Sequence, residues 1–284
     1  MHPIERLRYV ARASGTEQGL LVQETAGALA AFADDPAGLV TACRRIVGRH
    51  VASAPLWWLC GRVLTAVEPM PEAWAATREV AGDATAGELA HSLAQDATVC
   101  VLGWPEQVGE ALPRRGDLEV LVVDALGEGS GFVRALGRAD VDAIDVPVAG
   151  LGAAVTASDV VLLEASMVGP GAALAVAGSL AAACVATHVR NAMGAGPSSH
   201  PAPEPTPSGP EVWVVAGVGR LVPGRIFDHA VRRLAGATDP WDADDDTVPL
   251  SLVDRIVGPT GPLAVTDAVR RTDCAIAPEL FKEL

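Results

Sequence analysis

One uninterrupted stretch, residues 158–186, predicts a strand, a glycine turn and a helix of small residues. Its first part, Ser158–Leu163 (SDVVLL), has the continuous apolar run of a strand buried on both faces. A turn is expected over Glu164–Gly171 (EASMVGPG), because glycine and proline end regular elements. Ala172–Ala186 (AALAVAGSLAAACVA) is then predicted to be a helix. This order is that of a β-α unit, and in open α/β sheets ligands bind at the carboxyl ends of strands.

The rest of the chain predicts an α/β fold, in which a helical N-terminal region is followed by a Rossmann-like domain with a mostly parallel sheet. Apolar residues recur at helical spacing in the first third, in the segments Gly19–Phe32, Gly38–Val47, Pro55–Val67 and Ala73–Ala94. Short β-branched runs then alternate with helix-sized segments, at Thr98–Leu102, Leu118–Val123, Ala143–Val146, Val160–Leu163 and Val212–Val215. We therefore expect a helical domain over 1–94 and a Rossmann-like domain over 95–284.

Two segments of the second domain have loop compositions. Residues 191–210 (NAMGAGPSSHPAPEPTPSGP) are rich in proline, serine and glycine, which predicts a flexible insertion or, alternatively, a short proline-rich ligand for a partner. Residues 239–246 (DPWDADDD) form an acidic segment. Its alternating aspartates suggest a calcium-binding loop. The glycine and the final glutamate of such a loop are missing, so a solvent-exposed loop without calcium is favoured.

Composition excludes several classes of function. With 35 acidic and 21 basic residues the net charge is −14, which argues against binding to a nucleic-acid backbone. None of the five cysteines has C-x-x-C spacing, so no metal site is predicted, and buried thiols in a reducing cytoplasm are expected. The uncharged run 165–187 is broken by Gly169-Pro-Gly171, and what remains is shorter than the roughly 20 residues of a membrane span.

Known nucleotide and catalytic motifs are absent or partial. The chain contains no GxxxxGK[ST] sequence, which excludes the usual phosphate loop of ATPases. Gly150-Leu-Gly152 and Gly217-Val-Gly219 are incomplete glycine fingerprints. Arg220 follows the second, so this turn could hold a phosphate with backbone N–H groups and one guanidinium. A plain turn with an exposed arginine is favoured over this alternative.

Three segments resemble the family of the alpha, beta and delta subunits of eukaryotic translation initiation factor 2B (eIF2B). This family also includes the methylthioribose-1-phosphate and ribose-1,5-bisphosphate isomerases. Residues 157–186 look like its "DKVxVGADAVxxNGxVxNKxGT" segment, with Gly178-Ser179 at the closing Gly-Thr. VPLSLV (248–253) before Gly261-Pro-Leu is similar to its "TPPEYI…TxxG" tail, and EVWVVAG (211–217) to the strand before its "AAExYK". The resemblance implies a Rossmann-like fold and a homodimer.

The family's catalytic residues are missing from the matching positions. The resemblance implies a cysteine after the first sheet strand, but Gly103 stands there and Cys100 comes about three residues earlier. The aspartate of "GAD" falls at Ala165, between Glu164 and Ser166. The family's "ESRP" turn falls near Leu126. Of its residues only the acidic one has a counterpart here, which is Asp124.

These departures favour a non-catalytic or regulatory protein like the initiation factor subunits, without a cofactor. A sugar phosphate or nucleotide is its candidate ligand, and the candidate binding residues are Gly103, Asp124, Glu164, Ala165, Ser166, Gly178 and Ser179. The alternative is an aldose phosphate isomerase with displaced catalytic residues, in which Cys100, Asp124 and Glu164 would move the protons. A scaffold without any small ligand is a third hypothesis. For Glu164, a surface or capping role is favoured over one in the pocket.

Overall fold

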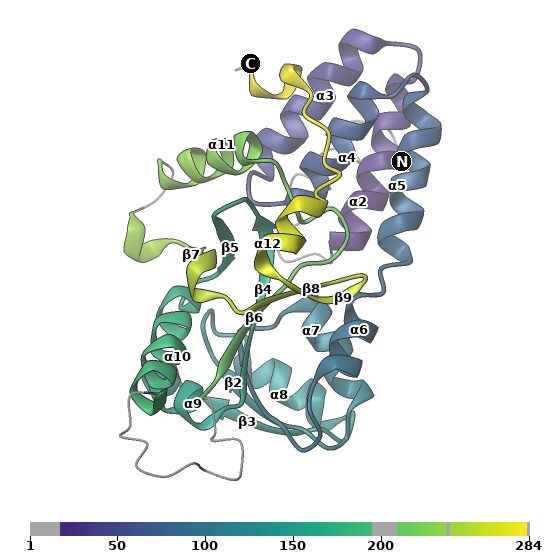
Figure 1. Cartoon of the computed structure of the whole chain (residues 1–284). Coiled ribbons are helices and arrows are strands. Elements are labelled where there is room, and N and C mark those ends of the chain that lie inside the picture. The colour runs from purple at the N-terminus through teal and green to yellow at the C-terminus, as the bar shows by residue number, and fades with distance from the viewer. Residues whose placement is uncertain (1–17, 195–208, 237–238, 283–284) are drawn as a thin grey trace.

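The computed structural model describes residues 18–194, 209–236 and 239–282. A layer of helices, purple to blue in Figure 1, lies at one end of the molecule, and the parallel sheet with its covering helices lies at the other. The helices of the first layer are α2 (Gln18–Leu29), α3 (Pro36–Arg49), α4 (Ala54–Thr65) and α5 (Pro69–Ala81), and α6 (Thr85–Ser92) then leads to the sheet.

The helix boundaries follow local chemistry. Proline occupies one of the first two positions of α3, α4 and α5, where its missing N–H breaks no helical hydrogen bond. The carboxylate of Asp35 caps α3 by accepting a hydrogen bond from the Gly38 N–H at 2.9 Å. The single helix expected over 73–94 is instead two helices, because α5 ends at Gly82, where a sharp turn starts.

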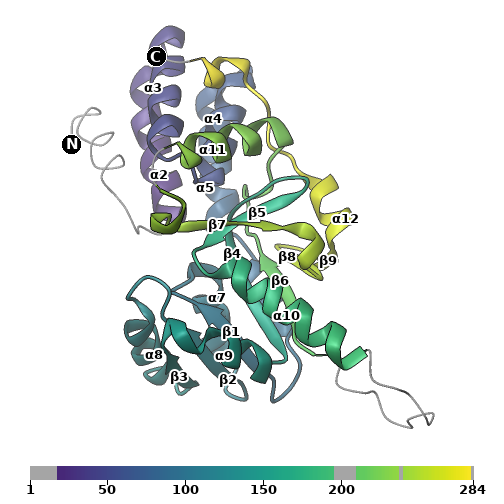
Figure 2. The same cartoon turned by 90° about the vertical axis from the view of Figure 1, so that its left-hand side faces the viewer.

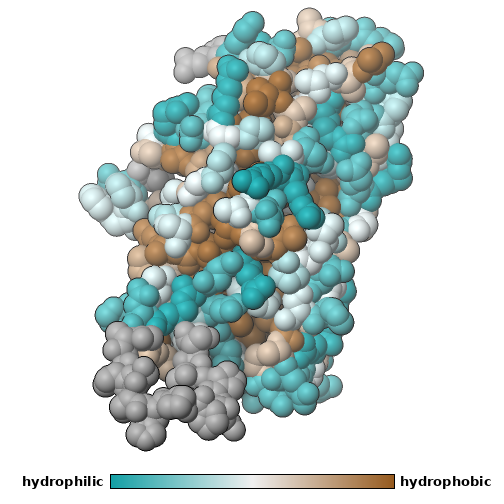
Figure 3. Space-filling model, in the orientation of Figure 1, coloured by the Kyte–Doolittle hydropathy of each residue, from teal (hydrophilic) through white to brown (hydrophobic). Residues whose placement is uncertain are grey.

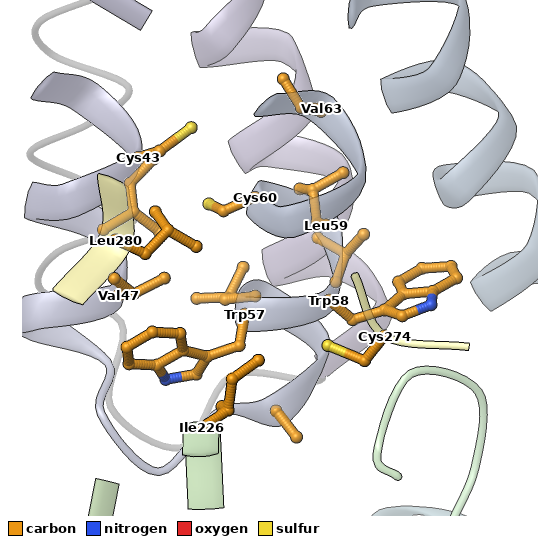
Figure 4. Packing of buried hydrophobic residues seen from close by; sticks show 14 of the residues in the cluster. Cys43, Val47, Trp57, Trp58, Leu59, Cys60, Val63, Ile226, Cys274 and Leu280 are labelled. Atoms are coloured by element: carbon orange, nitrogen blue, oxygen red, sulfur yellow. The ribbon is translucent and has the colours of Figure 1, made fainter. Parts of the chain in front are cut away.

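The helical layer shares its core with later parts of the chain. Trp57 and Trp58 of α4 are buried, and the ring of Trp57 lies 5.8 Å from that of Phe281 near the C-terminus. Figure 4 shows Trp57 with Val47, Ile226 and Leu280, which come from α3, from α11 (Gly224–Ala235) and from the C-terminal segment. The C-terminal segment thus returns from the sheet to pack against the N-terminal helices.

A parallel sheet forms the centre of the second part, with strand order β3-β2-β1-β4-β6-β8-β9. Its parallel strands are β1 (Thr98–Leu102), β2 (Glu119–Val123), β3 (Asp142–Val146), β4 (Val160–Val168), β6 (Glu211–Val215) and β8 (Arg255–Gly258), and β9 (Gly261–Ala264) adds an antiparallel edge. The predicted fold class is confirmed, because every strand expected from the β-branched runs is present and pairs in parallel.

Helices cover both faces of this sheet. One face packs against α6, α7 (Glu106–Ala111) and α8 (Gly129–Gly137), and the other against α9 (Leu151–Ala157) and α10 (Ser179–Gly194). Figure 2 shows α8 and α10 on opposite sides of the strands. Burial on both faces explains why the strands are continuous apolar runs rather than alternating ones.

The predicted turn and helix over 164–186 are wrong in detail. Strand β4 continues to Val168, and after a short turn β5 (Ala172–Val176) runs back antiparallel to it. β5 also pairs with β7 (Asp245–Pro249), so the acidic segment partly forms a strand, and helix α10 starts only at Ser179. An alanine- and valine-rich run suits either state, and here partners on both sides of β5 fix it as a strand.

The end of α10 also differs from expectation. The helix extends to Gly194, so the insertion predicted to begin at residue 191 starts with four helical residues. Residues 195–208 of that insertion lie outside the described part of the chain. No helix within the described ranges has the length and apolarity needed to cross a membrane.

Candidate functional site

The carboxyl ends of β1, β4 and β6 meet beneath the helical layer, and a buried ion pair lies there. Glu164, on β4, accepts a hydrogen bond at its Oε1 from Nη1 of Arg220 at 2.8 Å. The other carboxylate oxygen of Glu164 accepts from the backbone N–H of Val108 at 3.1 Å. The same guanidinium donates to the carbonyl oxygen of Ala165 at 2.9 Å and reaches Glu106 at 3.4 Å.

This arrangement bears on two expectations from the sequence. The exposed arginine of a plain turn is wrong, because the side chain of Arg220 is only 4% exposed. For Glu164 the surface role is wrong, since its side chain is 10% exposed, but its hydrogen bond from the Val108 N–H in the first turn of α7 is a capping contact. Removing two charges from water is costly, and the contacts from Ala165, Val108 and Glu106 offset that cost.

A small cavity of about 180 Å³ adjoins the ion pair, between the helical layer and the sheet. Its polar lining comes from Gln18, Asp83, Glu106, Gln107, Glu110 and Arg220. Three carboxylates therefore face one guanidinium. This volume is smaller than that of most ligand pockets, which measure about 300 to 1,000 Å³.

Asp83 joins the two layers at this cavity. Its carboxylate accepts from the N–H and hydroxyl of Thr85 and from the Val218 N–H at 2.8 Å. A β-carbon added to Gly217 would lie 2.3 Å from Oδ2 of Asp83, so only glycine allows this approach. The partial fingerprint Gly217-Val-Gly219 thus brings the chain close to a carboxylate rather than to a phosphate.

Gln107 is the one residue of the cavity with an unsatisfied buried group. Its Nε2 lies 3.5 Å from Oδ2 of Asp83, a long hydrogen bond. Its Oε1 is buried and has no hydrogen-bond partner among the described residues. Buried acceptors are nearly always paired, so a donor from a ligand or water is expected at this atom.

The remaining predicted site residues are brought to the same edge of the sheet but carry structural contacts. Gly103 ends β1 with a φ of +65°, and the carboxylate of Asp124, after β2, accepts from the Gly129 N–H at 2.9 Å and so caps α8. Ala165 is fully buried in β4, and the hydroxyl of Ser166 lies 3.4 Å from the carbonyl oxygen of Leu174.

The start of α10 is already filled by a carboxylate of the protein. Oδ2 of Asp246 accepts from the backbone N–H groups of Gly178 and Leu180, at 2.9 and 3.0 Å. Ser179 between them is fully buried, and its hydroxyl has no partner among the described residues. Asp246 thus takes the position that an anion would occupy at a free helix N-terminus.

Two functional contributors escaped the sequence analysis. Asp246 belonged to a segment interpreted as a solvent-exposed loop, and Glu106 carried no motif at all. The sequence pointed only to Arg220, because this residue follows a glycine turn that could hold a phosphate. The actual partner of Arg220 is an acidic side chain 56 residues away in sequence.

The thiol at this edge is poorly suited to proton transfer. Burial raises the pKa of the Cys100 thiol to about 12, so this thiol stays protonated near neutral pH. Among the described residues, no group of three or more histidine, cysteine or acidic side chains is arranged to hold a metal ion. The arrangement can hold a small polar ligand.

Comparison with known proteins identifies the fold. No family model and no curated protein matches the chain. Among solved structures, the translation initiation factor eIF-2B of Pyrococcus horikoshii OT3 superposes with a TM-score of 0.72 at 13% identity, covering 94% of this chain and 98% of that one.

Two structures from Chaetomium thermophilum agree. The eIF2B beta subunit has a TM-score of 0.69 at 14% identity and covers 98% of this chain and 92% of its own. A chain of the tetrameric eIF2B-beta2-delta2 complex has a TM-score of 0.70 at 17% identity, with coverages of 94% and 93%. The resemblance noted in the sequence is therefore confirmed as a shared fold over nearly the whole chain.

Proposed function

We propose that this protein is a divergent, non-catalytic member of the eIF2B-like family, with a regulatory role in the cytoplasm that depends on binding and assembly. The contact between Glu164 and Arg220 is the observation that carries this proposal. It occupies the strand end where the resemblance places a catalytic acid. A carboxylate held by a buried guanidinium and a backbone N–H is poorly placed to exchange a proton with a substrate.

The alternative function, an aldose phosphate isomerase, has less support. Of its three candidate residues, Cys100 lies inside a strand, and burial raises the pKa of its thiol. The carboxylate of Asp124 caps a helix, and that of Glu164 is bound to Arg220. We expect no conversion of ribose 5-phosphate or ribose 1,5-bisphosphate above the uncatalysed rate. Turnover by the wild-type protein that disappears in Glu164→Gln would instead establish the enzyme.

A small ligand at the sheet edge remains part of the proposal. Gly103, Asp124, Glu164, Ala165, Ser166, Gly178 and Ser179 are its proposed binding residues at this edge, and the cavity beside Arg220, which none of the seven lines, is its proposed entry. The unpaired Oε1 of Gln107 and the neighbouring carboxylates favour the hydroxyl groups of a sugar. A phosphate group would have to compete with Glu164 and Glu106 for Arg220. The ligand panel should therefore include ribose itself beside its phosphates and nucleoside monophosphates.

Thermal melting tests this ligand. A compound at about 100 times its dissociation constant adds about 2.7 kcal/mol of stability, which is readily seen as a shift of the melting temperature. Gln107→Met should abolish the shift, whereas the matched Gln23→Met, at an exposed position on α2, should preserve it. A flat panel, or an equal shift in Gln107→Met, would contradict a ligand at this cavity.

We further propose that the protein forms a homodimer through its sheet domain. Figure 3 shows apolar residues gathered in the middle of one face, and such patches often mark interfaces. One structure with the same fold is a tetrameric complex. Light scattering after size-exclusion chromatography should give twice the chain mass of 29.1 kDa. A monomer mass at all protein concentrations would refute the dimer.

A further inference from the structure

A second cavity lies away from the sheet edge, and no function described above uses it. It has a volume of about 560 Å³, within the range of small-molecule sites. Its walls come from the end of α3, from Trp57 of α4, from α11 and from the segment Leu280–Lys282. These parts converge near the C-terminus in Figure 1.

The charge of this cavity is opposite to that of the protein. Its lining includes Arg44, Arg45, Arg49, Arg233 and Lys282, together with His229, and no carboxylate of the described ranges 18–194, 209–236 and 239–282. Five of the 21 basic residues of a chain with net charge −14 thus face one cavity. Such a concentration raises the local positive potential and attracts anions.

Part of this clustering has a structural explanation. Arg49 lies in the last turn of α3 and Arg233 in the last turn of α11, where cations stabilise the negative end of a helix dipole. That effect does not account for Arg45 or Lys282. Among the described residues, no carboxylate pairs with the side chain of Arg45, Arg233 or Lys282.

The cavity contains one guanidinium that is held by a hydrogen bond, and it has an apolar wall. Nε of Arg44 donates to the carbonyl oxygen of Glu279 at 2.6 Å, which holds its guanidinium in place. Val47, Trp57 and Leu280 provide an apolar wall, and the imidazole of His229 lies 5.6 Å from the Trp57 ring, edge to face. Figure 4 shows the side chains of Val47, Trp57 and Leu280 close to one another.

We propose that this α3–α11 cavity binds a compact organic phosphate with two or more phosphate groups, such as a nucleoside diphosphate. Guanidinium groups form paired, charge-assisted hydrogen bonds with phosphate oxygens, and several of them together match a multiply charged anion. The apolar wall gives the organic part of such a compound a surface to pack against. This site is separate from the sheet edge cavity and does not depend on it.

Calorimetric titration with magnesium-free ADP at about 0.15 M salt tests the proposal, with adenosine as the uncharged control and pyrophosphate as the anion alone. ADP and pyrophosphate should bind, and adenosine should not. The double variant R45E/R233E should weaken ADP binding at least about tenfold. Both side chains are exposed, so the fold should persist, as circular dichroism will show.

A matched control isolates the effect of position from that of net charge. R134E/R138E removes two exposed arginines of the α8 region and changes the net charge equally, so ADP affinity should stay within about twofold of wild type. Gln107→Met should also bind ADP normally, because it alters only the sheet edge cavity. The proposal is overturned if wild-type protein binds no ADP at about 1 mM, if adenosine binds equally, or if both arginine double variants weaken binding alike.

Discussion

The guanidinium of Arg220 and the carboxylate of Glu164 lie 2.8 Å apart in the middle of β4, where its parallel pairing with β6 ends, both almost completely removed from solvent. Arg220 follows β6 and Glu164 lies on the neighbouring strand, so the pairing of β4 with β6 brings them together. The pair ties three segments, because Glu106 of α7 reaches the same guanidinium. The first prediction concerns what happens when this pair is broken.

Glu164→Ala should destabilise the protein by about 3 kcal/mol, because a buried guanidinium would lose its main partner. Replacing both residues, in Glu164→Leu/Arg220→Met, should recover part of that loss, since no unpaired charge remains. Urea unfolding followed by circular dichroism measures both variants. Equal stability of Glu164→Ala and wild type would show that the pair has no structural role.

Asp246→Ala should lower the stability by about 1 kcal/mol, because Gly178 and Leu180 would lose the acceptor that caps α10. Asp246→Ser, which keeps a capping oxygen, should lose less. Asp244→Ala serves as the control, since that neighbouring residue is exposed. A loss as large in Asp244→Ala as in Asp246→Ala would contradict capping and point to the charge of the segment.

The acidic segment should also make stability depend on pH. Burial raises the pKa of Asp245 to about 6, and the neighbouring carboxylates of Asp244 and Asp246 add to this effect. In the unfolded chain an aspartate ionises near pH 4. Between these values the folded protein retains a proton that the unfolded chain has lost, so the contribution of Asp245 to stability falls as the pH rises from about 4 to about 6 and is constant above.

Asp245→Asn removes this titration and tests its sign. At pH 8 the variant should be more stable than wild type by an amount on the order of 2 kcal/mol, and the advantage should shrink at pH 5. Unfolding in urea at the two pH values gives both differences. An advantage that is the same at pH 5 and pH 8 would show that Asp245 does not titrate in this range.

The cysteines should differ sharply in reactivity. Cys184 is exposed on α10, whereas the other four cysteines are buried, and burial raises the pKa of both Cys100 and Cys274 to about 12. Since the thiolate is the reactive form, a thiol reagent should label only Cys184 in the native protein and all five cysteines in denaturant. Mass spectrometry of the labelled peptides reads this out. Rapid native labelling of Cys100 would revive its role as an acid–base group.

The strands of the parallel sheet were predictable because burial on both faces leaves a signature that survives in a single sequence. β1 was placed at its observed residues, and the starts of β2 and β3 were missed by one residue. β5 was not recognised, because its alanines and valines suit a helix equally well. Its state depends on β4 and β7, and β7 lies about 70 residues further along the chain.

The candidate site divides in the same way. The sequence by itself determined that Gly103 and Asp124 follow the ends of two strands at one edge of the sheet, because parallel strands bring their carboxyl ends together. Only the tertiary structure decided what those residues contact. Arg220 was expected in solvent and lies against Glu164, and Asp246 was expected in a loop and caps α10. Patterns of apolar residues specify buried elements locally, whereas the partner of a charged side chain is fixed only when distant segments pack together.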